Sequence, residues 1–490
     1  MESKAEFFQT GPAKTYADAT LEPRESPYTM DEIDISSNYT RTIRLPLPVV
    51  SAAMDTVTEH EMAIAIAEEG GIGVMHYSMD IEQQYKEVRK VKKAMNGRIE
   101  KPISFFSDLT VEQILQICDQ KEYDFRTFPV TDRDKKFVGL LTGTHFLFPG
   151  NREKTVAEVM TPVERVVVAT GPTDIKKAAA VMEERGITTL PVIGKTGNVN
   201  GLYLYSDVHR ILHNSQGSNL DKKGQLRVAA AVPTDSTAID RIDEIIKYTD
   251  VIVINSAQGD TVKYAYETLK AIKKKYPDLE VVVGNITHPN SARNLAKLGA
   301  DAINVGQGSG AICTTRQQTG IGVPQLYAIW RCAEALKDTS VHVIADGGIQ
   351  HFGDISKALA AGASSVMLGS LLAGTPQAPG ATVTLPDGNK AKIYRGMGSG
   401  SAMRGSAAAM NRYKASGNAP LEEGVESYIP EKADVHIILN EIRQALTRSF
   451  MYCGVRSVAQ HQAETNFMEL SQGAVAESGA HIMSRSFRIV

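Results

Sequence analysis

The chain carries one cysteine in a setting that suits chemistry better than packing. Residues 306–316 read GQGSGAICTTR, with glycine at every second position from 306 to 310 and Cys313 close behind. Alternate glycines strip a loop of side chains and let backbone N–H and C=O groups approach a ligand closely. A thiol presented on such a loop is a candidate nucleophile, whereas free cysteines are more often small buried side chains. Cys118 and Cys332 fit that second description.

Two further glycine-rich turns complete a pattern that suits a sugar phosphate. ADGGI at 345–349 and MLGSLLAGT at 367–375 each follow an apolar run. In parallel barrels, the backbone amides of turns at such places commonly bind a phosphate group. Asp346 only accepts hydrogen bonds when ionised, so it suits sugar hydroxyls and not phosphate oxygens. The residues therefore predict a phosphate at these two turns and the reacting end of the ligand near Cys313.

The elements that position these loops alternate between strands and helices. Eight short apolar runs are separated by helical patterns such as 261–276 and 354–363. Strands that are apolar on both faces indicate a buried parallel sheet. Eight βα units favour an α/β fold of the (β/α)8 TIM barrel type, with its active face at the carboxyl ends of the strands; a doubly wound open sheet is the alternative. The predicted strands are 47–54, 71–76, 228–232, 251–256, 281–286, 302–306, 342–348 and 365–370.

An insertion with an internal repeat separates the second and third predicted strands. It is about 150 residues long, far beyond an ordinary connection. Within it, FRTFPVTDRDKKFVGLLTGTHF (125–146) is echoed by ITTLPVIGKTGNVNGLYLYSDV (187–208), and each copy follows a helical stretch, 110–122 and 174–186. The repeat resembles a tandem pair of cystathionine-β-synthase-type (CBS) modules spanning 101–212.

The CBS resemblance implies a regulatory insertion that binds an adenine or guanine nucleotide. In that family an aspartate near the last strand holds a ribose, and Asp207 matches it in the second repeat. The first repeat has His145 at the corresponding place. A β-rich lid without a ligand is the alternative. The catalytic barrel would then comprise residues 1–100 and 213–490.

The composition is that of an ordinary globular protein. The 490 residues are 42% hydrophobic and 22% charged, with a net charge of −3, which gives no electrostatic case for nucleic acid or a membrane surface. Four cysteines in so long a chain do not form a disulfide framework, and no CxxC pair suggests zinc. The N-terminal residues lack the apolar run of a signal peptide, and nothing reaches the length of a membrane span. We therefore expect a cytoplasmic protein.

Five longer motifs identify a family. They are VSAAMDTVTEHEMAIAIAEEGGIGVMH, GSGAICTTR, IADGGI, VMLGSLLAGT and YRGMGS. On these motifs the chain resembles the inosine-5′-monophosphate (IMP) dehydrogenase and GMP reductase family of purine-nucleotide oxidoreductases over nearly its whole length. The insertion after the second strand also fits the IMP dehydrogenases.

The resemblance implies oxidation of IMP with NAD in guanine nucleotide biosynthesis. Cys313 matches the nucleophile that attacks C2 of IMP as a hydride leaves to NAD⁺, and the covalent thioimidate is then hydrolysed to xanthosine 5′-monophosphate. Thr315 matches the threonine that helps to activate the attacking water. Arg412 and Tyr413 match the water-activating pair on a mobile flap at about 398–430.

The resemblance also assigns the binding residues. The expected contacts of IMP are Met54, Asn285, Gly310, Asp346, Gly348, Gly369, Ser370, Tyr394, Gly396, Met397, Gly398 and Glu423. The expected contacts of NAD are Asn255, Ser256, Gly306 and Gly308. A potassium ion is expected on the carbonyl oxygens of Gly308, Gly310 and Cys313, together with Glu477, Ser478 and Gly479 of a neighbouring subunit. A site shared between chains implies an oligomer, a homotetramer or an octamer.

Three positions depart from the family pattern. Ala311 replaces a serine next to the phosphate, which removes one hydrogen bond. Asn255 replaces an aspartate on the nicotinamide-ribose side, and Asn304 replaces a lysine or arginine on the sixth strand. Because both charged residues are replaced together, neither charge is left buried without its partner, and two amides can still form hydrogen bonds. Cofactor affinity and cofactor choice depend on these changes.

Two alternatives stay open. CTTRQQTGIG also resembles the loop of GMP reductases, which convert GMP to IMP and ammonia with NADPH. That branch commonly has a lysine just after the second strand and a glutamate in the flap, and this chain has neither in register. The second alternative is a non-catalytic, nucleotide-sensing paralogue; the three departures favour it, and Cys313, Thr315, Arg412 and Tyr413 speak against it.

Overall fold

The structure is a computed structural model that describes residues 4–95, 97–121, 123, 125–171, 173–209, 211–212, 217–406, 410, 412–413 and 421–479. The chain divides into two compact units. The larger comprises residues 1–94, 217–219 and 226–490, and the smaller comprises residues 95–216 and 220–225. No helix among the described residues combines the length and the apolar character needed to cross a membrane.

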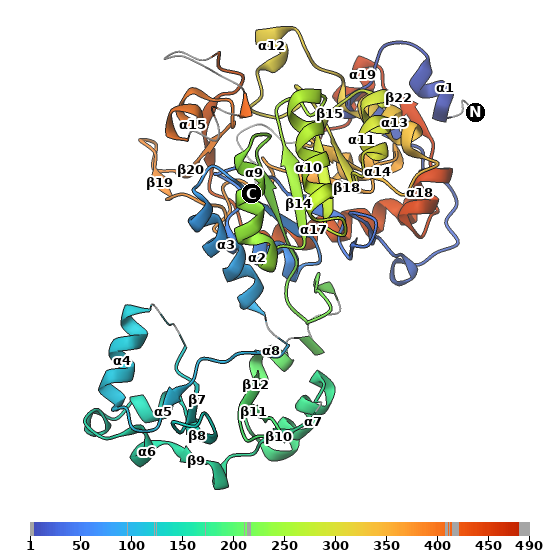
Figure 1. The fold of residues 1–490 in the computed structure, drawn as a ribbon. Coiled ribbons are helices and arrows are strands. Elements are labelled where there is room, and N and C mark those ends of the chain that lie inside the picture. The colour runs from blue at the N-terminus through green and yellow to red at the C-terminus, as the bar shows by residue number, and fades with distance from the viewer. Residues whose placement is uncertain are drawn as a thin grey trace. The chain divides into compact units, whose positions relative to one another are not determined.

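The larger unit is built on a closed barrel of eight parallel strands (Figure 1). The ring runs β13-β14-β15-β16-β17-β18-β4-β5 and closes because β5 pairs in parallel with both β4 and β13. The fold prediction is confirmed, and the doubly wound alternative is wrong because an open sheet would leave two unpaired edges. The barrel strands are β4 (Val49–Ser51), β5 (Ile72–Met75), β13 (Val228–Val232), β14 (Val251–Asn255), β15 (Glu280–Ile286), β16 (Ala302–Val305), β17 (His342–Asp346) and β18 (Ser365–Leu368).

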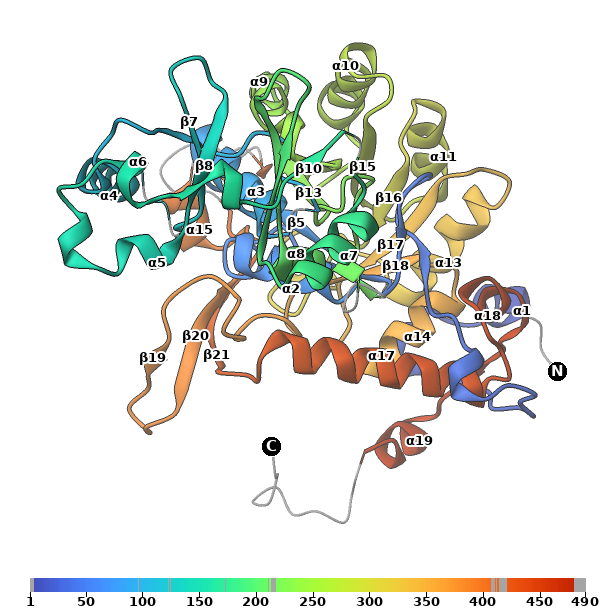
Figure 2. The same ribbon diagram turned by 90° about the horizontal axis from the view of Figure 1, so that it is seen from below.

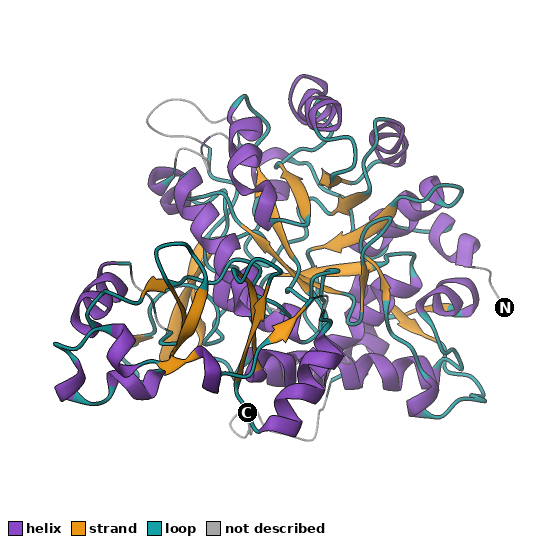
Figure 3. Ribbon diagram, turned by 60° about the horizontal axis from the view of Figure 1, so that its bottom comes forward, coloured by secondary structure: helices purple, strands orange, loops and turns teal. Residues whose placement is uncertain are grey.

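Helices cover the outside of the strands (Figure 3), which is why these strands are apolar on both faces. Branched side chains such as Val50, Val253, Val282 and Ile344 pack within one buried cluster of the barrel. Residues 261–276 were expected to form one helix; a π-helical turn at Val262–Tyr266 instead precedes the α-helix. The helices are α2 (His60–Glu68), α3 (Ile81–Ala94), α9 (Thr237–Ile245), α10 (Glu267–Lys275), α11 (Pro289–Lys297), α12 (Thr315–Thr319), α13 (Gln325–Leu336) and α14 (Phe352–Ala360).

Segments before and after the barrel strands complete this unit. The long helix α17 packs against α14 and α2 (Figure 2), and β19, β20 and β21 form a separate antiparallel sheet. β1 pairs with β22, which brings the two ends of the described chain together. These elements are α1 (Lys4–Gln9), β1 (Ala19–Leu21), β2 (Ser37–Asn38), β3 (Arg44–Leu45), β19 (Val383–Thr384), β20 (Lys390–Arg395), α15 (Gly400–Gly405), β21 (Glu426–Pro430), α17 (Val435–Tyr452), α18 (Val458–Glu464), β22 (Phe467–Glu469) and α19 (Gln472–Glu477).

The smaller unit contains two similar halves with separate cores. In each half a helix packs near an antiparallel strand pair, α4 with β7-β8 and α7 with β11-β12. Asp207 lies in the short helix after β12, and His145 lies in the short helix after β8, where its ring accepts the Thr142 N–H. The elements are β6 (Phe105–Phe106), α4 (Val111–Gln120), β7 (Phe128–Thr131), β8 (Phe137–Leu141), α5 (Gly143–Phe146), α6 (Val156–Val159), β9 (Thr161–Pro162), β10 (Ala169–Thr170), α7 (Ile175–Arg185), β11 (Thr189–Ile193), β12 (Val199–Leu204) and α8 (Tyr205–His209). Assignment of the halves to the CBS family stays a prediction.

Candidate active site

The glycine–cysteine loop leaves β16 at the carboxyl end of the barrel and lies directly against the end of β17. An added Cβ at Gly306 would lie 1.8 Å from the Asp346 carbonyl oxygen, so only glycine allows this approach. Gly308 has a positive φ of 75°, and its Cβ would meet Arg316 at 2.8 Å. The glycine spacing thus brings the loop backbone close to the neighbouring strand end.

Cys313 is half-buried and lines a pocket, unlike the other three cysteines, which are all free and buried. Its sulfur lies 3.1 Å from the hydroxyl oxygen of Thr315, at the start of α12. Burial raises the pKa of the Cys332 thiol to about 12 and also raises the pKa values of Cys118 and Cys453. Cys313 is therefore the cysteine placed for reaction with a ligand in the pocket.

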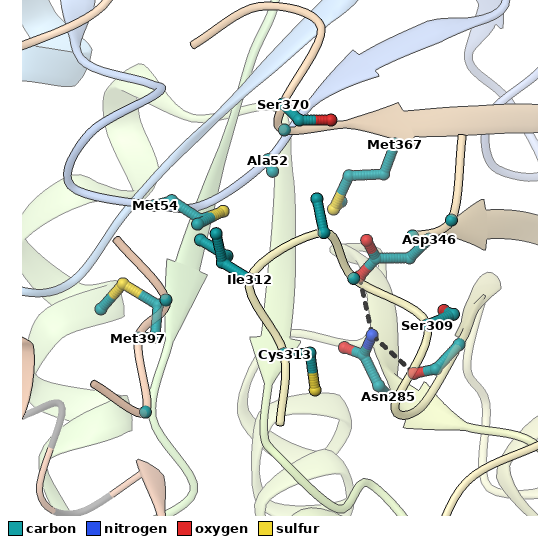
Figure 4. A pocket seen from close by; sticks show the side chains of 18 of the residues that line it. Ala52, Met54, Asn285, Ser309, Ile312, Cys313, Asp346, Met367, Ser370 and Met397 are labelled. Carbon is teal, nitrogen blue, oxygen red and sulfur yellow. Dashed lines mark hydrogen bonds between the residues drawn. The ribbon is translucent and has the colours of Figure 1, made fainter. Parts of the chain in front are cut away.

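The two glycine-rich turns line the same pocket (Figure 4). Gly347 and Gly348 both have positive φ values, 98° and 80°, so their backbone turns sharply at the end of β17. At the end of β18, an added Cβ on Gly369 would lie 2.9 Å from the Tyr394 hydroxyl oxygen. Open backbone and a phenol hydroxyl suit the oxygens of a phosphate group.

Asp346 and Asn285 form a polar pair on the wall of the pocket (Figure 4). The Asn285 amide donates to Asp346 Oδ2 at 2.7 Å and to the Gly306 carbonyl at 3.0 Å. Burial raises the pKa of the Asp346 carboxyl, although the Asn285 hydrogen bond and the Arg412 charge oppose that shift. Asn285 thus holds one oxygen of the Asp346 carboxylate, and the other oxygen can accept hydrogen bonds from hydroxyl groups.

Glu423 enters the pocket from the C-terminal part of the chain. Its carbonyl accepts the Thr314 N–H at 3.0 Å, and its own N–H donates to the Gly398 carbonyl at 3.0 Å. The neighbouring Val425 N–H donates to the Ile312 carbonyl at 3.0 Å. These backbone bonds fix the main chain of Glu423 beside the cysteine loop, and the residue lines the pocket.

Arg412 and Tyr413 also reach the pocket. The Arg412 guanidinium donates to the side-chain oxygen of Asn255, and an added Cβ on Gly398 would lie 2.6 Å from the Tyr413 ring. Burial raises the pKa of the Tyr413 phenol, and the adjacent Arg412 charge opposes that shift. Of the predicted flap at 398–430, residues 407–409, 411 and 414–420 lie outside the described residues.

Most of the residues that the sequence singled out lie in this one pocket. They are Met54, Asn255, Asn285, Gly306, Gly308, Gly310, Cys313, Thr315, Asp346, Gly348, Gly369, Ser370, Tyr394, Gly396, Met397, Gly398, Arg412, Tyr413 and Glu423.

Four predicted residues lie outside the lining. Ser256 is buried, and its hydroxyl donates to the Gln258 carbonyl at 3.1 Å. The other three, Glu477, Ser478 and Gly479, are exposed at the end of α19. Within the described residues no group of three His, Cys, Asp or Glu side chains could hold a metal ion.

Several residues at or next to the site were not predicted from the sequence. Ala52 and Ala53 line the pocket just after β4, and Gln350 lines it beyond the first glycine turn. Tyr77, just after β5, donates its hydroxyl to the Asn255 carbonyl at 2.8 Å. All follow barrel strands, so their position at the carboxyl ends was the available signal.

Fold and site together define a class of protein. At the carboxyl ends of its strands the closed parallel barrel carries a thiol, a carboxylate and glycine-rich turns that suit a phosphate group. This is the arrangement of a barrel enzyme that acts on a small phosphorylated molecule.

Comparison with known proteins identifies the family. The model of the IMP dehydrogenase / GMP reductase domain matches residues 13–481. The inosine-5′-monophosphate dehydrogenase of Aquifex aeolicus is 38% identical over 474 residues, 95% of each chain. That of Pasteurella multocida is 39% identical over 473 residues, 96% of each chain. The chain therefore belongs to the IMP dehydrogenase/GMP reductase family and is an oxidoreductase.

Solved structures of the same family superpose on the chain. A cysteine-to-alanine variant of GMP reductase from Trypanosoma brucei, in complex with guanosine 5′-monophosphate, has a TM-score of 0.90 and 31% identity, covering 98% of this chain and all (100%) of that one. The same reductase in complex with guanosine 5′-triphosphate has a TM-score of 0.79 and 29% identity, covering 95% of this chain and 100% of that one.

Proposed function

We propose that the chain oxidises IMP to xanthosine 5′-monophosphate with NAD⁺, through a covalent intermediate on Cys313. The observation that carries the proposal is the meeting in one pocket of Cys313, the glycine turns after β17 and β18, and the Arg412–Tyr413 pair. The family relatives named above as IMP dehydrogenases support it.

The first half of the reaction uses the thiol. The Cys313 thiol would lose its proton to solvent and add to C2 of the purine as the thiolate, and the hydride displaced from C2 would pass to NAD⁺. The phosphate of IMP would lie on the Gly348 and Ser370 turns and the Tyr394 hydroxyl, the ribose hydroxyls on Asp346, and the N1 edge of the purine against Glu423. Holding both ends of the nucleotide places C2 at the sulfur, which is an orientation effect.

The second half releases the product by hydrolysis. Water adds to C2, the bond to the Cys313 sulfur breaks, and xanthosine 5′-monophosphate leaves. Thr315, whose hydroxyl oxygen lies 3.1 Å from the sulfur, would help to activate that water. Arg412 and Tyr413 would take the proton of that water, as general base catalysis requires a group within hydrogen-bond reach.

The residues fit a nicotinamide cofactor on the β14 side of the pocket. The Asn255 side-chain oxygen accepts the Arg412 guanidinium, and the same oxygen could accept a ribose hydroxyl once Arg412 is withdrawn. Gly306 and Gly308 leave the loop backbone open beside it. The Ser256 hydroxyl is engaged with the Gln258 carbonyl, so only its backbone could contribute.

A potassium ion fits the loop in part. The carbonyls of Gly308, Gly310 and Cys313 are oxygen ligands of the kind that a large cation prefers, although the Gly310 carbonyl also accepts the Cys313 N–H at 3.1 Å. Glu477, Ser478 and Gly479 are exposed and would complete the site from a neighbouring subunit in a homotetramer or an octamer. Loss of activity on exchanging potassium for lithium would test this site.

The smaller unit would bind an adenine or guanine nucleotide and regulate the barrel. Asp207 lies just after β12, at the place where a ribose ligand is expected. Addition of each nucleotide should raise the melting temperature of the protein by mass action, and Asp207→Ala should reduce that rise. We propose that the protein is cytoplasmic.

GMP reduction with NADPH is the second candidate. The 0.90 TM-score with a GMP reductase favours it, as does the loop sequence CTTRQQTGIG. Arg412 in the pocket favours the dehydrogenase, because reduction of GMP needs no activated water.

One paired assay separates these functions. With IMP and NAD⁺, absorbance at the NADH wavelength should rise, and Cys313→Ala should abolish the rise. Consumption of NADPH with GMP and release of ammonia would assign the reductase. Neither reaction, with nucleotide binding retained, would assign a non-catalytic nucleotide sensor.

A further inference from the structure

Tyr77 follows β5 at the carboxyl end of the barrel and is 4% exposed. Its ring packs in the buried barrel cluster, so its position is fixed by the core. Its hydroxyl donates to the backbone carbonyl of Asn255 at 2.8 Å. The hydroxyl therefore lies at the pocket end of β14, where the Asn255 side chain receives Arg412.

The segment that follows Tyr77 is held independently of the pocket. Buried Arg241 donates to the Met79 carbonyl at 3.0 Å and to the side-chain oxygen of Gln84 at 3.0 Å. Gln84 in turn donates to the His76 carbonyl at 3.0 Å and to the Ala231 carbonyl at 2.9 Å. Residues 76–79 are thus fixed before any nucleotide binds.

Arg412 reaches this corner through Asn255. Its guanidinium donates to Asn255 Oδ1, and the Tyr77 hydroxyl donates to the backbone carbonyl of the same residue. The charge of Arg412 also acts on the Tyr77 phenol, whose pKa it lowers against the larger effect of burial. Tyr77 therefore holds the residue that receives the arginine.

Among the described residues the guanidinium donates to the neutral amide of Asn255. The charged or titratable groups that act electrostatically on this corner are Asp346, Asp235, Arg241, Cys313 and Glu423. The neighbouring Tyr77 and Tyr413 already raise the pKa of Arg412 against the effect of burial. A carboxylate in contact would favour the protonated guanidinium further and make its deprotonation harder.

We propose that Tyr77, together with Asn255, is a positioning residue that docks Arg412 in the pocket for the hydrolytic half of the reaction. This role rests on the proposed function, because it needs Arg412 to act on water. Tyr77 itself touches no reacting atom; it acts through Arg412.

The test separates the two halves of the reaction. Tyr77→Phe keeps the ring and removes only the hydroxyl. The first-turnover burst of NADH with IMP and NAD⁺ should match the unmodified protein, whereas steady-state turnover should fall roughly tenfold, with the KM for IMP unchanged. Tyr39→Phe is the matched control, since the Tyr39 hydroxyl is also buried in the barrel cluster but has no hydrogen-bond partner among the described residues. Equal loss of burst and turnover in Tyr77→Phe would overturn the proposal.

A second variant tests whether the neutral side chain of Asn255 matters for Arg412. Asn255→Asp places a carboxylate against Arg412, so the pH at which steady-state turnover rises should move upward by roughly one unit relative to the unmodified protein. An unchanged profile in this variant, or a profile that Tyr39→Phe shifts equally, would contradict the assignment.

The positioning of Arg412 by Tyr77 can also be tested without enzyme turnover. Trypsin cleavage after Arg412, followed by mass spectrometry without nucleotides, should be several-fold faster in Tyr77→Phe than in Tyr39→Phe. If IMP and NAD⁺ yield no NADH at all, the proposed function fails and the cleavage rates alone decide whether Tyr77 docks Arg412. Equal cleavage rates would refute the dock.

Discussion

The Cys313 sulfur lies 3.1 Å from the Thr315 hydroxyl oxygen, at the carboxyl end of a closed parallel barrel. The short turn between them is held by the backbone bond from Thr314 N–H to the Glu423 carbonyl. A thiol and a hydroxyl are thereby fixed side by side, facing the turns suited to a phosphate. The following predictions depend on that geometry.

Thiol alkylation should find Cys313 first. Burial raises the pKa of Cys332 to about 12 and shields Cys118 and Cys453, and only the thiolate reacts. At pH 8, limiting iodoacetamide should label Cys313 at least tenfold faster than the other three, as measured by peptide mass spectrometry. Saturating IMP should slow that labelling; preferential labelling of Cys332 would contradict the arrangement.

Gly369→Ala should weaken nucleotide binding and leave the fold intact. The added methyl would lie 2.9 Å from the Tyr394 hydroxyl oxygen and push it out of the phosphate region. We expect the KM for IMP to rise roughly tenfold or more, about the loss of one hydrogen bond to a charged group. Gly353→Ala is the control, because its Cβ would meet nothing within 4 Å; equal effects of the two changes would argue against a phosphate site.

Asp346→Asn should weaken the binding of IMP and stabilise the folded protein at pH 7. Burial raises the folded pKa of this carboxyl above its ordinary value, so the folded state binds more protons and the wild-type protein loses stability as pH rises through that window. The asparagine stays neutral. At pH 7 the melting temperature should therefore rise by roughly 1–4 °C, with the gain shrinking as pH is lowered, while the KM for IMP increases. A lower melting temperature of the variant at pH 7 would show that the buried Asp346 carboxylate does not destabilise the folded state.

His461 should make the barrel sensitive to acid. It is fully buried beside Ser356 and Thr465, and burial lowers its pKa to about 3. The unfolded chain gains a proton on His461 below about pH 6.5 and the folded chain does not, so stability falls by up to about 1.4 kcal/mol per pH unit from there toward pH 3. His461→Gln should show a smaller drop in melting temperature between pH 7 and pH 5; an equal drop would rule His461 out as the cause.

The barrel could be predicted because its strands are short, apolar on both faces and separated by helices. The glycine spacing at 306–310 and the turns at 345–349 and 367–375 also placed three loops at one end of the barrel. The contributions of Arg412, Tyr413 and Glu423 needed the family resemblance, because nothing in the local sequence brings those residues back to the pocket.

Other features depended on contacts that no local pattern encodes. Tyr77 looks like one more aromatic residue after a strand, and its bond to the Asn255 carbonyl arises from the pairing of β5 with β13 and β13 with β14. Asn255 departed from the family pattern on the cofactor side, and in the structure its side-chain oxygen accepts the Arg412 guanidinium. Ser256 was expected at the cofactor, yet its hydroxyl turns back to Gln258.

The central claim is a bond between one sulfur atom and the purine ring. Protein mixed with IMP and NAD⁺ can be quenched in acid within the first turnover, digested and analysed by mass spectrometry. We predict a nucleotide on the peptide that contains Cys313, in an amount equal to the NADH formed, and no adduct in Cys313→Ala. NADH formation without any adduct at this residue, or an adduct on another cysteine, would contradict the account.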